Sequence, residues 1–252
     1  MDFEIIMAEI LSNAIVEEID FENLDQCTKG IFTELKDLNQ NGLKRIIKTF
    51  GIPDSFYDWK IETKTPLIDS SNDAETDWVR DTDGNAISNT YITFINPTFK
   101  NTATKNGITR TVLHELIHAF LLSQLDGLPN GNTNQTQFKN NFPLLWSSYI
   151  DQDCSCTANE AHHEAIAQLF VNTLAAGLKE WDNSQNDDKY YKDLAWGGLS
   201  ETDIFKNTNS LTNDERLRIS RTNLAEDKNQ EQTYINSNNQ TITINPKGTD
   251  CN

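Results

Sequence analysis

Two histidines and a glutamate interrupt the apolar segment 111–122, which reads TVLHELIHAFLL. His114, Glu115 and His118 form the pattern H-E-x-x-H, and on a helix the positions i and i+4 lie on one face. Both imidazoles could then bind one metal ion, while the glutamate lies beside the ion and can accept a proton from a water molecule. Because buried polar side chains need partners, a shared metal ion explains this composition better than two core histidines do.

A catalytic zinc site needs a third protein ligand and an open position for water. The chain has four histidines, and the two outside the motif, His162 and His163, are adjacent in the segment ANEAHHEAIAQLF. Apolar residues at helical spacing are slightly more continuous from His163 than from His162, so we expect His163 to face inward as the third ligand. His162 is the alternative.

The segments around the motif predict an α+β fold in which a small mixed or antiparallel sheet packs on the helix that carries the motif. The acidic, turn-rich segment 69–85 and the polar segment 129–141 are expected to be loops. The strand near 90–96 could pair with an extended substrate, as edge strands do. Helices are expected at 23–38, 40–50, 108–125, 142–151, 158–180 and from Asn213, and strands at 56–64 and 86–96.

The chain of 252 residues is long enough for one domain with a substantial core. We expect that domain over 23–225, after a lead-in at 1–22. Residues 226–252 are polar and are predicted to be a weakly ordered tail, in which QTITIN could form a short edge strand.

Composition limits the partners and the compartment. A net charge of −17 repels phosphate backbones, so nucleic acid is not an expected partner. No run reaches the roughly 18–20 apolar residues of a membrane helix, and the acidic start MDFEIIMAEIL is not typical of an export signal.

The four cysteines are consistent either with free thiols or with an oxidising compartment. Cys154 and Cys156 would form a strained disulfide with each other, so we expect that one of them could pair with Cys27 or Cys251.

The segment TVLHELIHAFLL resembles the active helix of the zincin clan of metallopeptidases in its SprT-like form. The order of CTKGIFTELKDLNQNGLKRIIKTFG, TYITFIN, HHE and YYKDLAWGGL is similar to that of bacterial zincin-like metalloproteases that are often exported or lipid-anchored. This resemblance implies a zincin fold, Zn²⁺ and peptide-bond hydrolysis, with His114 and His118 as ligands and Glu115 as general base. One branch of the clan uses a helix glutamate as third ligand, which adds Glu160 and Glu164 as alternatives.

Glu160 and Glu164 could equally be solvated carboxylates near a helix N-terminus. Glu164 could also accept a hydrogen bond from a ligand histidine. For Tyr190, Tyr191 and Trp196 we favour ordinary packing, although they could line a cleft or donate to an oxyanion.

The expected function is that of a zinc metallopeptidase acting on a peptide or protein substrate, and an exported or cell-envelope location is favoured. Two alternatives stay open at this point. One is a metal-stabilised binding or surface protein that cleaves nothing, and the other is a zinc amidase that acts on cell-wall peptide bonds.

Overall fold

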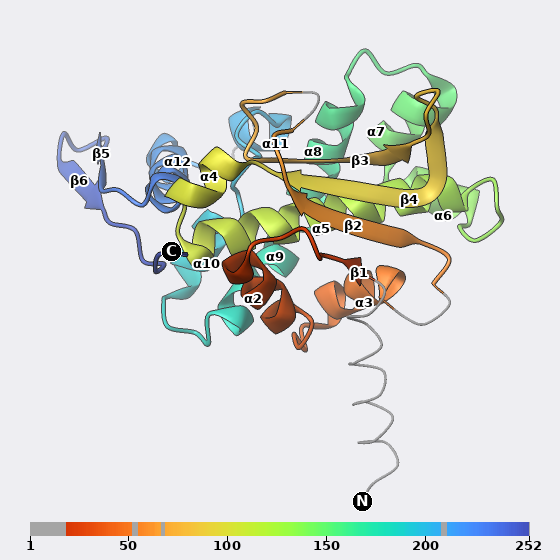
Figure 1. Cartoon of the computed structure of the whole chain (residues 1–252). Coiled ribbons are helices and arrows are strands. Elements are labelled where there is room, and N and C mark those ends of the chain that lie inside the picture. Colours follow the sequence, from red (N-terminus) through yellow and green to blue (C-terminus); the bar gives the residue numbers. More distant parts are fainter. Residues whose placement is uncertain (1–18, 52–54, 67–68, 208–210, 252) are drawn as a thin grey trace, which may run out of the picture.

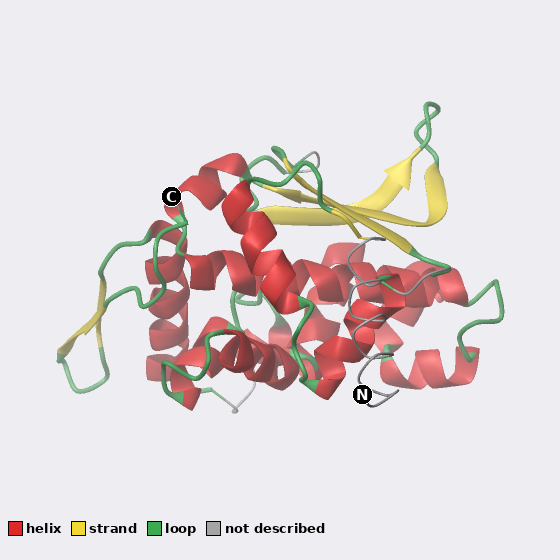
Figure 2. Cartoon of the chain, turned by 60° about the horizontal axis from the view of Figure 1, so that its bottom comes forward, coloured by secondary structure: helices red, strands yellow, loops and turns green. Residues whose placement is uncertain are grey.

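The computed structural model describes residues 19–51, 55–66, 69–207 and 211–251. The fold is mixed α+β, with a small mixed sheet on one side of a long central helix and most of the other helices on the opposite side (Figures 1 and 2). Residues 1–18 of the lead-in expected at 1–22 lie outside the described residues, whereas Ile19–Asp20 forms a strand of the sheet.

The sheet has four strands in the order β1-β2-β4-β3, formed by β1 (Ile19–Asp20), β2 (Asp58–Thr63), β3 (Ala74–Arg80) and β4 (Ala86–Ile95). The first three in this order run parallel to one another, and β3 runs antiparallel to β4. The expectation that residues 69–85 form only loops is therefore wrong. The strand near 90–96 is also not an edge, since β4 lies between β2 and β3.

The described helices pack mainly below this sheet in the view of Figure 2. The predicted helix 158–180 is in fact two helices that meet at Phe170, and the predicted loop 129–141 contains a short helix. None of the described helices combines the length and apolar character needed to cross a lipid bilayer. The helices are α2 (Gln26–Leu35), α3 (Asn41–Phe50), α4 (Pro97–Thr102), α5 (Lys105–Gly127), α6 (Gln135–Asn141), α7 (Pro143–Trp146), the π-helical turn η1 (Ser147–Asp151), α8 (Ala158–Leu169), α9 (Val171–Trp181), α10 (Asp188–Leu194), α11 (Asp203–Asn207) and α12 (Asn213–Lys228).

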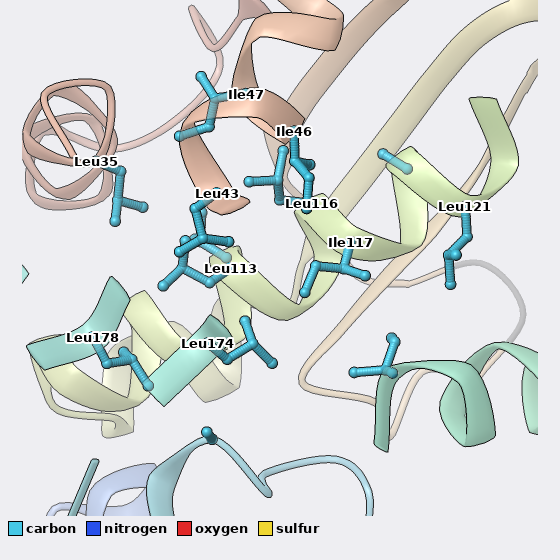
Figure 3. Close-up of a cluster of buried hydrophobic side chains, with 14 of the residues drawn as sticks. Leu35, Leu43, Ile46, Ile47, Leu113, Leu116, Ile117, Leu121, Leu174 and Leu178 are labelled. Atoms are coloured by element: carbon cyan, nitrogen blue, oxygen red, sulfur yellow. The ribbon is translucent and has the colours of Figure 1, made fainter. Parts of the chain in front are cut away.

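Helix α5 is the centre of the core. Its N-terminus is capped by Thr104, whose hydroxyl accepts a hydrogen bond from the Gly107 amide. Most residues of α5 are buried, and they include the polar motif residues as well as the apolar ones, because the helix is packed on nearly all sides. Leu113 and Ile117 pack with leucine and isoleucine side chains of α3 and α9 (Figure 3). Packing on all sides gives the motif residues fixed positions.

The C-terminal segment is more ordered than expected. Strands β5 (Gln232–Ile235) and β6 (Thr241–Ile244) form an antiparallel hairpin beside α12. The amides of Lys247 and Gly248 then donate to the buried Glu226 carboxylate of α12 at 2.7 and 3.2 Å. The expectation of a weakly ordered tail does not include this hairpin or these hydrogen bonds of residues 226–251, whereas the short strand expected in QTITIN is present as β6.

Two disulfides link the four cysteines. Cys27 at the start of α2 pairs with Cys251, and Cys154 pairs with Cys156. The expected cross-pairing of the C-x-C segment with Cys27 or Cys251 is therefore wrong. The Cys27–Cys251 bond spans 224 residues and fastens the C-terminal segment to the body of the domain.

Candidate metal centre

The first two candidate ligands lie one turn apart on α5. The Nε2 atoms of His114 and His118 face each other at 3.0 Å, and both rings are buried. Two nitrogens bound at about 2.0–2.1 Å to one tetrahedral zinc ion lie about 3.3 Å apart. The pair is therefore already close to the separation that a shared ion requires.

The third imidazole comes from α8. Thr157 and Glu160 form a capping box that fixes the start of this helix. His163, in its second turn, brings its ring to within 5.0 Å of the His118 ring and 5.3 Å of the His114 ring, measured between centroids. One ring nitrogen from each of these three histidines lies within 4.8 Å of the other two. The three side chains could hold a metal ion.

The other candidates for third ligand have different partners. His162 is only 3 % exposed, and its Nδ1 lies 3.1 Å from Nδ1 of His118, on the side of that ring away from the His114 contact. Glu160 accepts from the Thr157 amide, and Glu164 accepts from the Asp203 amide. The prediction that His163 faces inward more than His162 does is wrong. His162 is the deeply buried member of the pair and His163 is half-buried, and both contribute to the lining of the cleft.

Burial keeps the four imidazoles neutral. It lowers the pKa of His163 to about 4 and that of His162 to about 3, and the neighbouring His163 adds to the lowering for His162. The pKa values of His114 and His118 lie well below 6.5, again first because of burial and then because of the neighbouring histidines, with Arg110 adding to the lowering for His114. A neutral imidazole is the form that binds metal.

These shifts predict that the metal-free protein is destabilised by acid. An unfolded histidine titrates near pH 6.5, so between about pH 6.5 and 4 the unfolded chain binds more protons than the native one. The free energy of unfolding therefore decreases as the pH is lowered through this window. Glu115 and Asp227, whose pKa values burial raises to about 7 and about 6, act in the opposite sense but are outnumbered by the four histidines. We expect a lower urea midpoint at about pH 5 than at about pH 7.5, and equal midpoints would contradict the burial of neutral imidazoles.

Glu115 is held by a chain of hydrogen bonds across three strands. Trp59 Nε1 donates to the Thr93 hydroxyl at 2.9 Å, which lies 2.6 Å from the Thr76 hydroxyl. Thr76 in turn donates to Glu115 Oε2 at 2.7 Å. Since the indole can only donate, all three bonds can be oriented toward the carboxylate. The sheet thus positions the candidate base through Thr76, a residue in the segment that was expected to be a loop.

The Glu115 carboxyl has a raised pKa of about 7. Burial is the largest cause, and the nearby Glu75 and Asp73 add to it, whereas the Thr76 hydrogen bond and Arg110 act in the opposite direction. A general base or acid works best when its pKa lies near the working pH. Glu115 could therefore both accept and release a proton near neutrality.

A cleft of about 660 Å³ opens onto these residues. Its walls are the edge strand β3, the motif face of α5 and the first turns of α8, and Tyr149 of η1 also contributes. Tyr149 packs against the His162 ring with centroids 5.8 Å apart. Among the described residues, the lining does not include the three aromatics considered from the sequence. Tyr190 and Tyr191 instead donate to buried or half-buried carboxylates, and Trp196 packs on Phe205.

Gly198 lines the cleft and lies against the His114 ring. Its φ is +79°, and an added Cβ would lie 3.2 Å from His114 Cε1. We expect Gly198→Ala to lower metal affinity by about tenfold and stability by about 1–2 kcal/mol, because the methyl group meets the ring and the left-handed backbone disfavours alanine. Gly131→Ala is the matched control, since Gly131 has a φ of +74° with nothing within 4 Å of the added Cβ. Equal metal affinities for the two variants, measured by chelator competition, would contradict the close packing on His114.

Comparisons of the chain with protein-family models, with curated proteins and with solved structures find no match. Function must therefore be argued from the site.

Proposed function

We propose that this protein is a zinc-dependent metallopeptidase with a zincin-like active site. The observation that carries the proposal is the convergence of His114, His118 and His163 next to the buried Glu115 carboxyl in an open cleft. Many catalytic zinc sites consist of three neutral imidazole ligands and an open fourth position for a water molecule.

In this proposal each residue has a defined task. When bound by the three imidazoles, zinc would supply Lewis acidity, which lowers the pKa of water toward 7 and polarises a peptide carbonyl. Glu115 accepts a proton from the attacking water and delivers it to the leaving amine. Thr76 keeps the carboxylate oriented throughout, since its hydroxyl donates to Oε2.

The substrate is proposed to be an extended peptide or protein segment. Strand β3 is the edge of the sheet and lines the cleft, so its free edge could pair with an extended chain beside Glu115. Across the cleft, burial and the nearby Asp77 raise the pKa of Tyr149 to about 12, so its hydroxyl stays protonated at neutral pH. It could donate to the negative charge that develops on the carbonyl oxygen.

Thr76→Val is expected to move the pH dependence of hydrolysis. Loss of a hydrogen bond that favours the ionised carboxylate raises the pKa of Glu115, so the acid limb of kcat/KM should shift upward by about one pH unit. Thr76→Ser keeps the hydroxyl and should keep the wild-type profile. Matching profiles for the valine variant and the wild type would contradict this role for Thr76.

An exported or cell-envelope location is part of the proposal, supported by the two disulfides. The proposed catalytic role of Glu115 also separates this function from that of a metal-binding protein that cleaves nothing. Such a protein has no need for a buried carboxyl with a pKa of about 7 beside its ligands.

The test of function is hydrolysis by the zinc-loaded protein. It is incubated with unfolded proteins, a peptide library and cell-wall peptides, with and without a chelator. Cleavage that the chelator abolishes and added zinc restores is expected for unfolded proteins or peptides. Cleavage of cell-wall peptides alone would identify an amidase instead, and no cleavage of any substrate would contradict a hydrolytic function.

A further inference from the structure

His162 is buried beside the proposed metal centre, yet its ring is not part of the three-histidine cluster. Its Nδ1 lies 3.1 Å from Nδ1 of His118. The two ring planes differ by only 13° while the centroids are 5.2 Å apart, so the rings meet at their nitrogen edges rather than face to face. This geometry allows an N–H···N hydrogen bond nearly in the plane of both rings.

If His118 binds a metal ion through Nε2, the proton in this bond belongs to His118. His118 directs Nε2 toward the cluster, where Nε2 lies 3.0 Å from His114 Nε2. A neutral imidazole that binds metal through Nε2 carries its proton on Nδ1, and that N–H needs an acceptor. The nearest acceptor is Nδ1 of His162, which fixes the His162 proton on Nε2.

We propose that His162 is a positioning residue for the metal centre: it accepts the Nδ1 proton of His118 and so fixes both the tautomer and the ring orientation of that ligand. This inference rests on the proposed metal centre. It gives the two adjacent histidines of α8 different tasks, with His163 in the cluster and His162 behind it. It also assigns to His162 the role of acceptor that Glu164 could have played, since Glu164 accepts from the Asp203 amide.

His162 is unfavourable for the stability of the metal-free protein, which supports a task in metal binding. Its Nε2 is buried without a hydrogen-bond partner among the described residues. A buried polar atom without a partner lowers stability, and an apolar side chain of similar size would avoid that cost. Tyr149 packs on the ring from the cleft side, and this contact requires bulk rather than a ring nitrogen.

The test compares His162→Leu, which keeps bulk, with His162→Asn, whose Oδ1 can accept in place of Nδ1. Zinc affinity is measured by competition with a chromophoric chelator, and Gln168→Ala, an exposed site on the same helix, is the control. We expect a 10–100-fold loss of affinity for the leucine variant, and a loss of less than about threefold for the asparagine and control variants. The metal-free leucine variant should unfold at the same or a higher urea concentration than the wild type.

Other results would overturn the inference. Wild-type affinity in His162→Leu would show that the hydrogen bond does not matter. A loss in His162→Asn as large as that in His162→Leu would show that an acceptor does not suffice, and that His162 binds the ion itself. Neither result depends on turnover, so a zinc-binding protein that hydrolyses nothing would contradict the proposed peptidase function and leave this inference standing.

Discussion

Replacing Glu115 by glutamine should leave the metal bound and abolish hydrolysis. The amide has the size of the carboxyl and can still accept the hydrogen bond from Thr76, which donates at 2.7 Å. It cannot accept a proton from water or deliver one to the leaving amine. General acid–base catalysis contributes about 10²–10⁴-fold, and Glu115 is proposed to act in both steps, so turnover should fall by at least about 10³-fold.

Zinc affinity of Glu115→Gln should stay within a few-fold of the wild-type value, measured in the same samples. Glu34→Gln is the matched control, because it makes the same chemical change at an exposed residue of α2 that does not line the cleft. The control should lose no more than about 0.5 kcal/mol of stability and keep its turnover. Undiminished hydrolysis by the Glu115 variant would refute its role as the base.

Removing the imidazole of His163 should weaken metal binding strongly. Structural zinc sites bind with about 10–16 kcal/mol, so loss of one protein ligand is expected to cost about 3–4 kcal/mol, or about 10²–10³-fold in affinity. His163→Leu tests this by chelator competition and by zinc content after dialysis. Its ring is half-buried and lines the cleft, so the fold should tolerate the change.

Glu164→Gln and Glu160→Gln test the rival third ligands. Both carboxylates already accept backbone hydrogen bonds, from the Asp203 and Thr157 amides respectively. We expect both variants to bind zinc as the wild type does. Normal affinity in His163→Leu combined with a large loss in either glutamine variant would place the third ligand on a carboxylate.

Part of the site could be predicted because local pattern suffices for it. The apolar run around His114, Glu115 and His118 predicts a buried helix, and the i, i+4 spacing then places both imidazoles on one face. Because the chain has only two histidines outside the motif, composition alone limits a third imidazole ligand to His162 or His163. The spacing of apolar residues along α8 does not predict correctly which of His162 and His163 is more buried. One side of this helix packs against the core, and another side faces the cleft.

Strand β3 and its contribution to the site were missed because acidic residues are rare in strands. The sequence contains two signals of this strand. Thr76 and Trp78 are two positions apart and would lie on one face of a strand. Asp83-Gly84 then precedes a second segment with alternating residues, an arrangement that is typical of a hairpin. The hydrogen bond from Thr76 to Glu115 joins residues 39 positions apart. No local pattern predicts such a contact.

The disulfides and the C-terminal segment depend on the fold in the same way. Cys27 and Cys251 are 224 residues apart and meet because the chain returns to the start of α2. The polar composition of residues 226–252 suggested weak order. Composition does not predict that the buried Glu226 carboxylate accepts hydrogen bonds from the backbone amides of Lys247 and Gly248.

Native metal analysis combined with anomalous diffraction at the zinc edge tests the central claim most directly. The predicted result is about one zinc ion per chain, with an anomalous peak about 2.0–2.1 Å from a ring nitrogen of each of His114, His118 and His163. His162 should lie behind His118 without touching the ion. A protein purified without metal that takes up none, or a peak away from these three imidazoles, would contradict the account.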